Sequence, residues 1–175
     1  MIEPTRGSNG SAPGHDAHAT AAIVALAARL EVGRGLKAKG IATPSGLLLA
    51  MELEPCERRP RVRITGRIQA FDWNARTLRL LGHDLSIAPG VVATTPEGGV
   101  LDLARLTPGA GVRIEAVPDG GAGWTIGTIR LRDRRDFVIE KLEGAIDAVD
   151  VDRALLTLAG FRVRLDPGTV MGDER

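Results

Sequence analysis

The fold is decided by a segment that occurs twice, ITGRIQAFDWNARTLRLLGHDLSIAPGVV (64–92) and LEGAIDAVDVDRALLTLAGFRVRLDPGTV (142–170). The copies align without a gap at a spacing of 78 residues and are identical at ten of 29 positions. Ordinary residue frequencies would give about two identities over that length. The chain is therefore an internal duplication of one small unit.

A second, shorter repeat precedes each copy, because ARLEVGRG (28–35) returns as ARLTPGAG (104–111) after 76 residues. We call the segment that begins at this motif half-unit b and the segment with the long repeat half-unit a. The chain then runs b (29–61), a (62–93), b (104–141) and a (142–171). We expect the two additional residues of the second copy to enter in a turn, where ATPSG (42–46) becomes PDGGAG (118–123), because turns tolerate insertions.

Half-unit a has the two-residue period of a β-strand. Within 61–69, positions 62, 64, 66 and 68 are apolar or glycine and the others are charged or polar, which predicts a half-buried strand. The remainder predicts a three-stranded meander, with turns at 72–74 and Gly82-His83 and, in the second copy, at 150–152 and Gly160-Phe161.

Half-unit b adds two strands in each copy. We predict strands at 36–41 and 47–54 in the first copy, and at 112–117 and 124–131 in the second. The apolar alternation of the last strand changes phase near Gly127, which predicts a β-bulge there.

These elements make the fold class all-β. Five or six short strands in an open sheet would leave two edges exposed to pairing with other chains, whereas closure removes the edges. We therefore predict two small OB-like β-barrels with one short N-terminal helix, and a single longer sandwich is the alternative. Gly66 and Gly144 lie mid-strand on the inward side, where we expect a side chain to crowd the barrel axis.

The order of the half-units leaves the domain boundaries open. In one interpretation, 62–141 is a complete small barrel, and 29–61 plus 142–171 close a second barrel across the chain ends. In the other, 29–103 and 104–175 are sequential repeats. Exchange of half-units between chains is also open, so we expect a monomer or a strand-swapped dimer.

The leader, 1–28, differs in composition from the repeats. Its segment 5–18 is rich in Gly, Ser, Asn and Pro, which predicts a flexible chain, and TAAIVALAARL (20–30) predicts a helix that plugs the open end of a barrel. His15, Asp16 and His18 fit a polar linker better than a metal site, because no further ligand completes the set. The leader lacks the pattern of a signal peptide.

The repeated residues also resemble a known family. The motifs G-x-I-x-A-x-D, L-x-L-x-G, Asp166-Pro167-Gly168-Thr169 and R-L-x-x-G-x-G are similar to those of the bacterial domain of unknown function 5666, a small β domain. The resemblance covers 29–171, and the first copy departs from it at 88–91. It implies tandem copies in exported or envelope proteins, hence the cell envelope or periplasm, and it implies no activity. Without a visible signal peptide, the default location is cytoplasmic.

Composition excludes several classes of protein. The net charge of +1 over 175 residues gives no overall field to attract a polyanion. Cys56 is the single cysteine, so an intrachain disulfide is impossible, and no stretch reaches the 18 apolar residues of a membrane span. Because no Ser-His-Asp set, phosphate loop or inward carboxylate pair emerges, we predict a protein that is not an enzyme and binds no metal and no cofactor.

Two arginine clusters form the candidate binding surface. Together with one aromatic residue, they comprise Arg58, Arg59, Arg61, Arg63, Arg67, Arg130, Arg132, Arg134, Arg135 and Trp73. The strand phases direct most of them outward as two basic stripes, which is one requirement for binding single strands. Aromatic residues that could stack on bases are few, and acidic neighbours dilute the charge, so solvated edge strands are the simpler interpretation.

Two functions of different classes follow. The first is a non-enzymatic structural or interaction module that binds a protein or glycan partner. The alternative is an OB-like protein that binds single-stranded nucleic acid through the arginine stripes.

Overall fold

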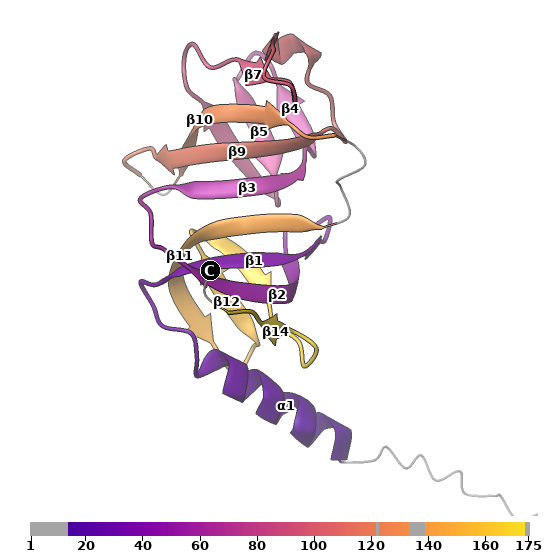
Figure 1. The fold of residues 1–175 in the computed structure, drawn as a ribbon, viewed down its shortest axis with the longest axis vertical. Coiled ribbons are helices and arrows are strands. Elements are labelled where there is room, and N and C mark those ends of the chain that lie inside the picture. Colours follow the sequence, from indigo (N-terminus) through magenta and orange to yellow (C-terminus); the bar gives the residue numbers. More distant parts are fainter. Residues whose placement is uncertain (1–13, 122, 134–138, 174–175) are drawn as a thin grey trace, which may run out of the picture.

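The computed structural model describes residues 14–121, 123–133 and 139–173, and it confirms the all-β class (Figure 1). Within these residues one α-helix, α1 (Gly14–Ala27), precedes the strands. The strands drawn from the two ends of the chain, which we call the terminal unit, are β1 (Gly35–Ala42), β2 (Leu48–Cys56), β11 (Glu140–Asp150), β12 (Leu155–Leu158), β13 (Phe161–Arg164) and β14 (Val170–Met171).

The strands between them form what we call the central unit. They are β3 (Val62–Arg67), β4 (Ala70–Asp72), β5 (Thr77–Leu80), β6 (His83–Ile87), β7 (Ala93–Thr94), β8 (Val100–Leu101), β9 (Gly111–Pro118) and β10 (Trp124–Leu131), with a 3-10 turn η1 (Leu103–Arg105) after β8. Figure 1 shows the central unit above the terminal unit. The repeat pattern predicts no element at 94–103, so the β7–β8 hairpin and η1 are additions.

The strands of the terminal unit pair in a closed ring. β1 pairs with β2, β2 with β13, β13 with β12, β12 with β11, and β11 again with β1. Only β2–β13 is parallel among these, and β14 adds a short parallel pairing to β2. The central unit follows the same scheme in the order β3-β9-β10-β6-β5-β4, with β4 beginning soon after β3 ends.

The pairing register is the same in both units, which corrects the position of the insertion. Leu36 lies opposite Pro55, and their counterparts Val112 and Leu131 lie opposite each other, so the spacing of 76 persists through both strands of half-unit b (112 − 36 and 131 − 55). The expected insertion in the turn is therefore wrong. The two additional residues lie between β10 and β11, where the chain links one half-unit to the next.

The predicted bulge in β10 is confirmed. The β9–β10 register shifts between Ile126 and Thr128, and the β1–β2 register shifts at the equivalent place, beside Gly40. A bulge increases the local bend and twist of a strand, which a tightly curved sheet of few strands requires. Both units therefore bend by the same device.

The core of each unit is aliphatic, as the alternation in 61–69 predicts. Val62, Ile64 and Ile68 are at most 2% exposed, and Phe161 is the largest fully buried side chain. The predicted crowding applies to only one of the two mid-strand glycines. A Cβ on Gly144 would lie 2.7 Å from the Cβ of Ala159, whereas a Cβ on Gly66 would meet nothing closer than 3.7 Å.

The hairpin turns lie one residue earlier than expected. Leu81 and Gly82 both have positive φ, as do Ala159 and Gly160, which is the requirement of a two-residue type I′ turn. Phe161 consequently belongs to the core of β13 rather than to a turn.

The other predicted turns are confirmed. The Asp72 carboxylate accepts from the Ala75 amide at 3.0 Å, and that of Asp150 accepts from the Arg153 amide at 3.1 Å.

The two units meet through an antiparallel pairing of β3 with β11. Ile64 lies opposite Leu142, its own counterpart in the other repeat, and the pairs on either side, Arg63 with Glu143 and Thr65 with Lys141, also exchange under the repeat. A pseudo-two-fold axis therefore passes between these strands.

Further side-chain contacts join the two units. The rings of His83 and Phe161, which are also counterparts, lie 4.5 Å apart, and the Trp124 indole donates to the Ala159 carbonyl at 2.9 Å.

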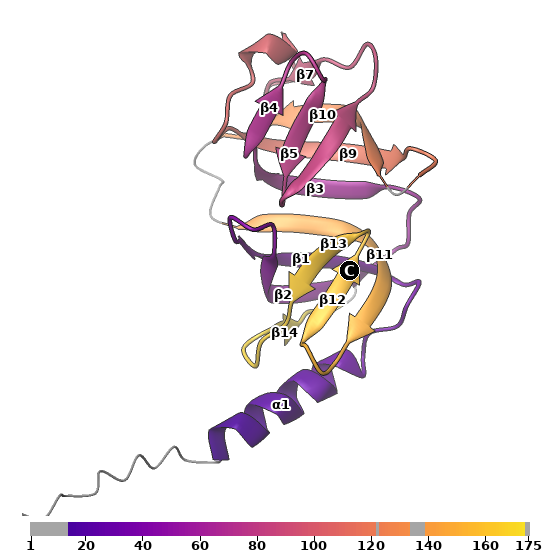
Figure 2. The same ribbon diagram turned by 180° about the vertical axis from the view of Figure 1, so that it is seen from behind.

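The helix does not plug either unit, contrary to the sequence interpretation. It begins earlier than the predicted 20–30 segment, and only Leu26 and Ala27 at its last turn are buried, whereas Val24 is 48% exposed. Figures 1 and 2 both show α1 projecting away from the terminal unit. Within the described residues, no helix has the length and apolar character needed to cross a bilayer.

Candidate functional site

The pseudo-two-fold axis creates one polar surface that spans both units. Strands β1, β11, β3 and β9 are consecutive neighbours across the axis, with β2 and β10 outside them, and Figure 1 looks onto this set. The side chains that alternate with the buried ones on these strands point outward. We call this surface the joint face.

One line of side chains across the joint face alternates in charge. We call it the paired row; from β2 to β9 it consists of Glu54, Lys37, Glu143, Arg63 and Glu115. Lys37 Nζ lies 2.8 Å from Glu54, and the Arg63 guanidinium lies 2.6 Å from Glu115 and 3.4 Å from Glu143. Opposite charges on facing strands stabilise a sheet, so this row supports itself.

The protonation equilibria of the paired row follow from these contacts. Hydrogen bonds from Lys37 and Lys39 lower the pKa of Glu54 to about 2. Burial alone would raise the pKa of Glu115, but the hydrogen bonds and charge of Arg63 outweigh it, and the pKa lies below the ordinary glutamate value. Both carboxylates are therefore ionised at neutral pH.

The adjacent line across the joint face carries no acid between β1 and β10, although Glu52 of β2 continues it opposite Lys39. We call it the cation row; from β1 to β10 it consists of Lys39, Lys141, Thr65, Arg113 and Arg130. Lys39 contacts Glu52 at 3.2 Å and also pairs with Glu54, and Arg130 donates to the Pro96 carbonyl at 2.8 Å. In the described part of the chain, Lys141 and Arg113 form no ion pair, and the Thr65 hydroxyl makes no hydrogen bond.

Burial and repulsion act on Arg113 in particular. Its pKa lies below the ordinary arginine value because the side chain is partly desolvated and because the positive charges of Arg63 and Arg132 are close. Arginine nevertheless stays charged in proteins. Within the cation row, Arg113 and Lys141 therefore carry positive charge that no ion pair among the described residues neutralises.

The two rows are images of each other under the duplication. Lys37, Arg63 and Glu143 of the paired row correspond to Arg113, Lys141 and Thr65 of the cation row, while Glu54 and Glu115 correspond to Arg130 and Lys39. Every carboxylate of the paired row is thus replaced in the cation row, twice by a cation and once by threonine. These three differences make the distribution of charge on the joint face asymmetric about the pseudo-two-fold axis.

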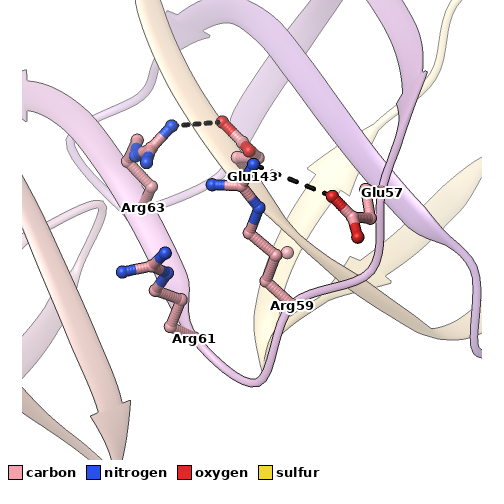
Figure 3. Close-up of a pocket in the computed structure, with 6 residues that line it drawn as sticks. Glu57, Arg59, Arg61, Arg63 and Glu143 are labelled. Carbon is pink, nitrogen blue, oxygen red and sulfur yellow. Dashed lines mark hydrogen bonds and ion pairs between the residues drawn. The ribbon is translucent and has the colours of Figure 1, made fainter. Parts of the chain in front are cut away.

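Two depressions lie over the β3–β11 pairing and differ in size. One of about 10 Å³ is lined by Glu57, Arg59, Arg61, Arg63, Glu143 and Gly144, and Figure 3 shows Arg63 directed at Glu143 and Arg59 at Glu57. That volume admits about one water molecule. The other, a hollow of about 230 Å³, is lined by Lys37, Arg63, Thr65, Arg113, Arg132, Lys141 and Glu143. Of these two, only the second could hold a ligand. A third depression, of about 580 Å³, lies at the outer edge of the joint face, between 89–94 and the side chains of Arg113 and Arg130.

The arginines of the first predicted cluster do not form a separate stripe. Arg58 and Arg59 are exposed in the link between β2 and β3, and Arg67 is exposed at the end of β3. Arg61 pairs with Glu115 at 2.9 Å, so it joins Arg63 beside the paired row.

The second predicted cluster lies partly on the joint face. Arg130 ends the cation row and Arg132 lines the hollow of about 230 Å³, whereas Arg134 and Arg135 lie outside the described residues. Trp73 lies at the β4–β5 turn, 48% exposed beside Phe71, away from the joint face.

Sequence reasoning missed the lysines and the threonine of the cation row. Alternation in 35–42 and 111–118 directs Lys37, Lys39 and Arg113 outward, so their exposure could have been predicted. Their assembly could not, because nothing in the sequence alone shows that β3 pairs with β11.

The structure offers little for chemistry elsewhere. Among the described residues, no group of three His, Cys, Asp or Glu side chains is close enough to hold a metal ion. Burial raises the pKa of the Cys56 thiol, with a smaller contribution from Glu143, which disfavours the reactive thiolate. His83 packs against Phe161, and burial lowers its pKa. Neither residue is poised as a nucleophile.

No protein-family model matches the sequence, and comparisons with curated proteins and with solved structures give no match.

Proposed function

We propose that this protein is a non-enzymatic interaction module of two OB-like β-barrels, whose joint face binds an acidic protein or glycan partner. The closed ring of pairings in the terminal unit, and the same scheme in the central unit, support the two-barrel architecture, with 62–141 as one barrel and 29–61 plus 142–171 as the other. On the motifs of the repeats, we also propose that each unit is related to the domain of unknown function 5666.

The observation that carries the proposal is the contrast between the two rows. Like charges placed opposite each other on neighbouring strands destabilise a sheet, and this chain keeps four cations in one row beside a row in which cations and acids alternate. An acidic partner laid across the joint face would neutralise them.

Single-stranded nucleic acid is the second candidate, because the cation row crosses several strands as a phosphate-tracking groove would. The described aromatic residues weigh against it. Trp73 is at a distant turn, Trp124 donates to Ala159, and Phe161 is buried, so none is placed to stack bases beside the cation row.

Binding to three labelled polyanions, measured by fluorescence anisotropy at 50 and 300 mM salt, tests the proposal. The polymers are poly-glutamate, polygalacturonate and a thirty-nucleotide oligo-dT. We expect poly-glutamate or polygalacturonate to bind, with an affinity that falls with salt and drops at least fivefold in a Lys39→Gln, Arg130→Gln double variant.

The matched control is an Arg162→Gln, Arg164→Gln double variant, which removes two exposed cations from β13, away from the joint face. Equal loss in the control, or no binding at 50 mM salt, would reject the joint face as the binding surface. An affinity for oligo-dT ten times that for the other polymers would favour the nucleic-acid alternative.

A further inference from the structure

The larger of the two hollows over the β3–β11 pairing is built around a missing carboxylate. In the paired row, Glu143 lies between Lys37 and Arg63 and forms an ion pair with Arg63 at 3.4 Å. Its image under the pseudo-two-fold axis is Thr65, which lies between Arg113 and Lys141. The two cations that flank this position thus have no acid between them.

We propose that the hollow at Thr65 binds one small oxyanion, a phosphate, sulfate or carboxylate group, in the place where the other repeat supplies Glu143. The inference deepens the proposed function, on which it rests in part, by naming the chemical group that anchors the partner. The paired row shows that such an arrangement fits on this surface, because the Glu143 carboxylate lies there between the cations Lys37 and Arg63.

The size of the hollow agrees with a single group. Its volume of about 230 Å³ is below the roughly 300–1,000 Å³ of pockets for drug-sized ligands, so it suits one anionic group and not a whole small molecule. Five of its lining residues are cationic, Lys37, Arg63, Arg113, Arg132 and Lys141, and one, Glu143, is acidic.

The preferred ligand depends on which of these cations already have an ion pair within the protein. Lys37 already pairs with Glu54, and Arg63 with Glu115 and Glu143, so these two cations are neutralised within the fold. Arg113 and Lys141 have no ion pair among the described residues, and the Thr65 hydroxyl is available to donate. Two charges and a hydroxyl match a doubly charged tetrahedral oxyanion better than a single carboxylate.

The test uses the full chain and inorganic phosphate, titrated by calorimetry in a chloride buffer at pH 7.5. We expect one saturable site per chain, and a thermal midpoint that rises with phosphate. Thr65→Glu supplies the missing carboxylate from within the protein. It should raise the midpoint without phosphate and weaken phosphate binding at least tenfold. Arg113→Gln should weaken binding as strongly while leaving the phosphate-free midpoint unchanged or higher, and Arg164→Gln should change neither.

The outcomes separate this inference from the proposed function. Phosphate binding that is absent, or that survives unchanged in Thr65→Glu and Arg113→Gln, overturns the oxyanion site even where acidic polymers still bind the joint face. Phosphate binding without any polymer binding keeps the site and rejects the module. Parallel titrations with O-phosphoserine, a sulfate ester and acetate identify the source of the group, and acetate binding ten times tighter than phosphate would overturn the preference for a tetrahedral dianion.

Discussion

Gly66 and Gly144 occupy equivalent positions of the two repeats but have different surroundings. At Gly144 the neighbouring atom is the Cβ of Ala159, which is fixed to the backbone of a turn and cannot rotate away. At Gly66 the corresponding turn leaves ordinary van der Waals space. The glycine is therefore required by sterics in one repeat only, which the sequence alone could not distinguish because both copies read G-x-I.

This difference gives a matched pair of substitutions. Gly144→Ala should lower the free energy of unfolding by about 1–3 kcal/mol, because the new methyl group forces the β12–β13 turn to shift. Gly66→Ala should leave it unchanged or raise it by about 0.5 kcal/mol, because alanine restricts the unfolded chain. Urea denaturation of both variants measures the effect, and equal destabilisation of the two would contradict the steric account.

At the scale of elements, the β1–β2 hairpin carries its own electrostatic support. Glu54 accepts hydrogen bonds from Lys37 and Lys39 across the hairpin, and these hold its pKa near 2. A carboxyl whose pKa is lower in the folded state than in the unfolded state stabilises the fold at high pH. That stabilisation is fully present above the unfolded pKa of about 4.5 and is lost as the pH falls toward 2.

Glu54→Gln should therefore act in a pH-dependent way. At pH 7 we expect it to lower the free energy of unfolding by about 1 kcal/mol, and the difference from the unsubstituted protein should shrink steadily below pH 4.5. Urea midpoints at pH 7, 5 and 3 measure it. Asp84→Asn is the control, because Asp84 is exposed and its one ion pair among the described residues is with Arg79 at 3.3 Å. A difference for Glu54→Gln that stays constant with pH would refute the assignment.

Most elements could be predicted from alternation, and the exceptions have physical causes. The strands of half-unit b and the bulge at Gly127 follow from the apolar period. The hairpin turns lie one residue before their predicted positions. The sequence does not indicate this, because Leu81 and Ala159 adopt positive φ, a conformation that residues with side chains disfavour. The helix was predicted but its packing was not, since an alanine-rich segment looks apolar whether or not it is covered.

At the scale of the molecule, the two units are built from crossed halves of the chain. The first half-unit b pairs with the last half-unit a, and the middle two pair with each other, so both units depend on pairings between different copies of the repeat. The cation row could not be predicted from the sequence, because it also depends on these pairings between different copies. Its members come from five separate strands that only this arrangement brings side by side.

The arrangement predicts how excised segments behave. Residues 62–141 should fold alone as a monomer, because, apart from the pairing of β3 with β11, the described strands β3 to β10 pair with one another. Residues 29–103 should fold only by exchanging half-units with a second copy. Circular dichroism and analytical ultracentrifugation of both segments measure this, with an unfolding midpoint that depends on concentration for 29–103 alone. A folded monomer of 29–103 would instead support sequential repeats.

The opposition of Ile64 to Leu142 has a further consequence. An assembly of two identical half-length chains about the same axis would be bound to repeat each substitution on both sides, so its two rows could never differ. Covalent fusion removes that obligation. In the fused chain, one copy can retain the acids that stabilise the sheet while the other carries different residues at the equivalent positions. The two halves of a nearly symmetric scaffold can then serve different purposes, one structural and one for binding.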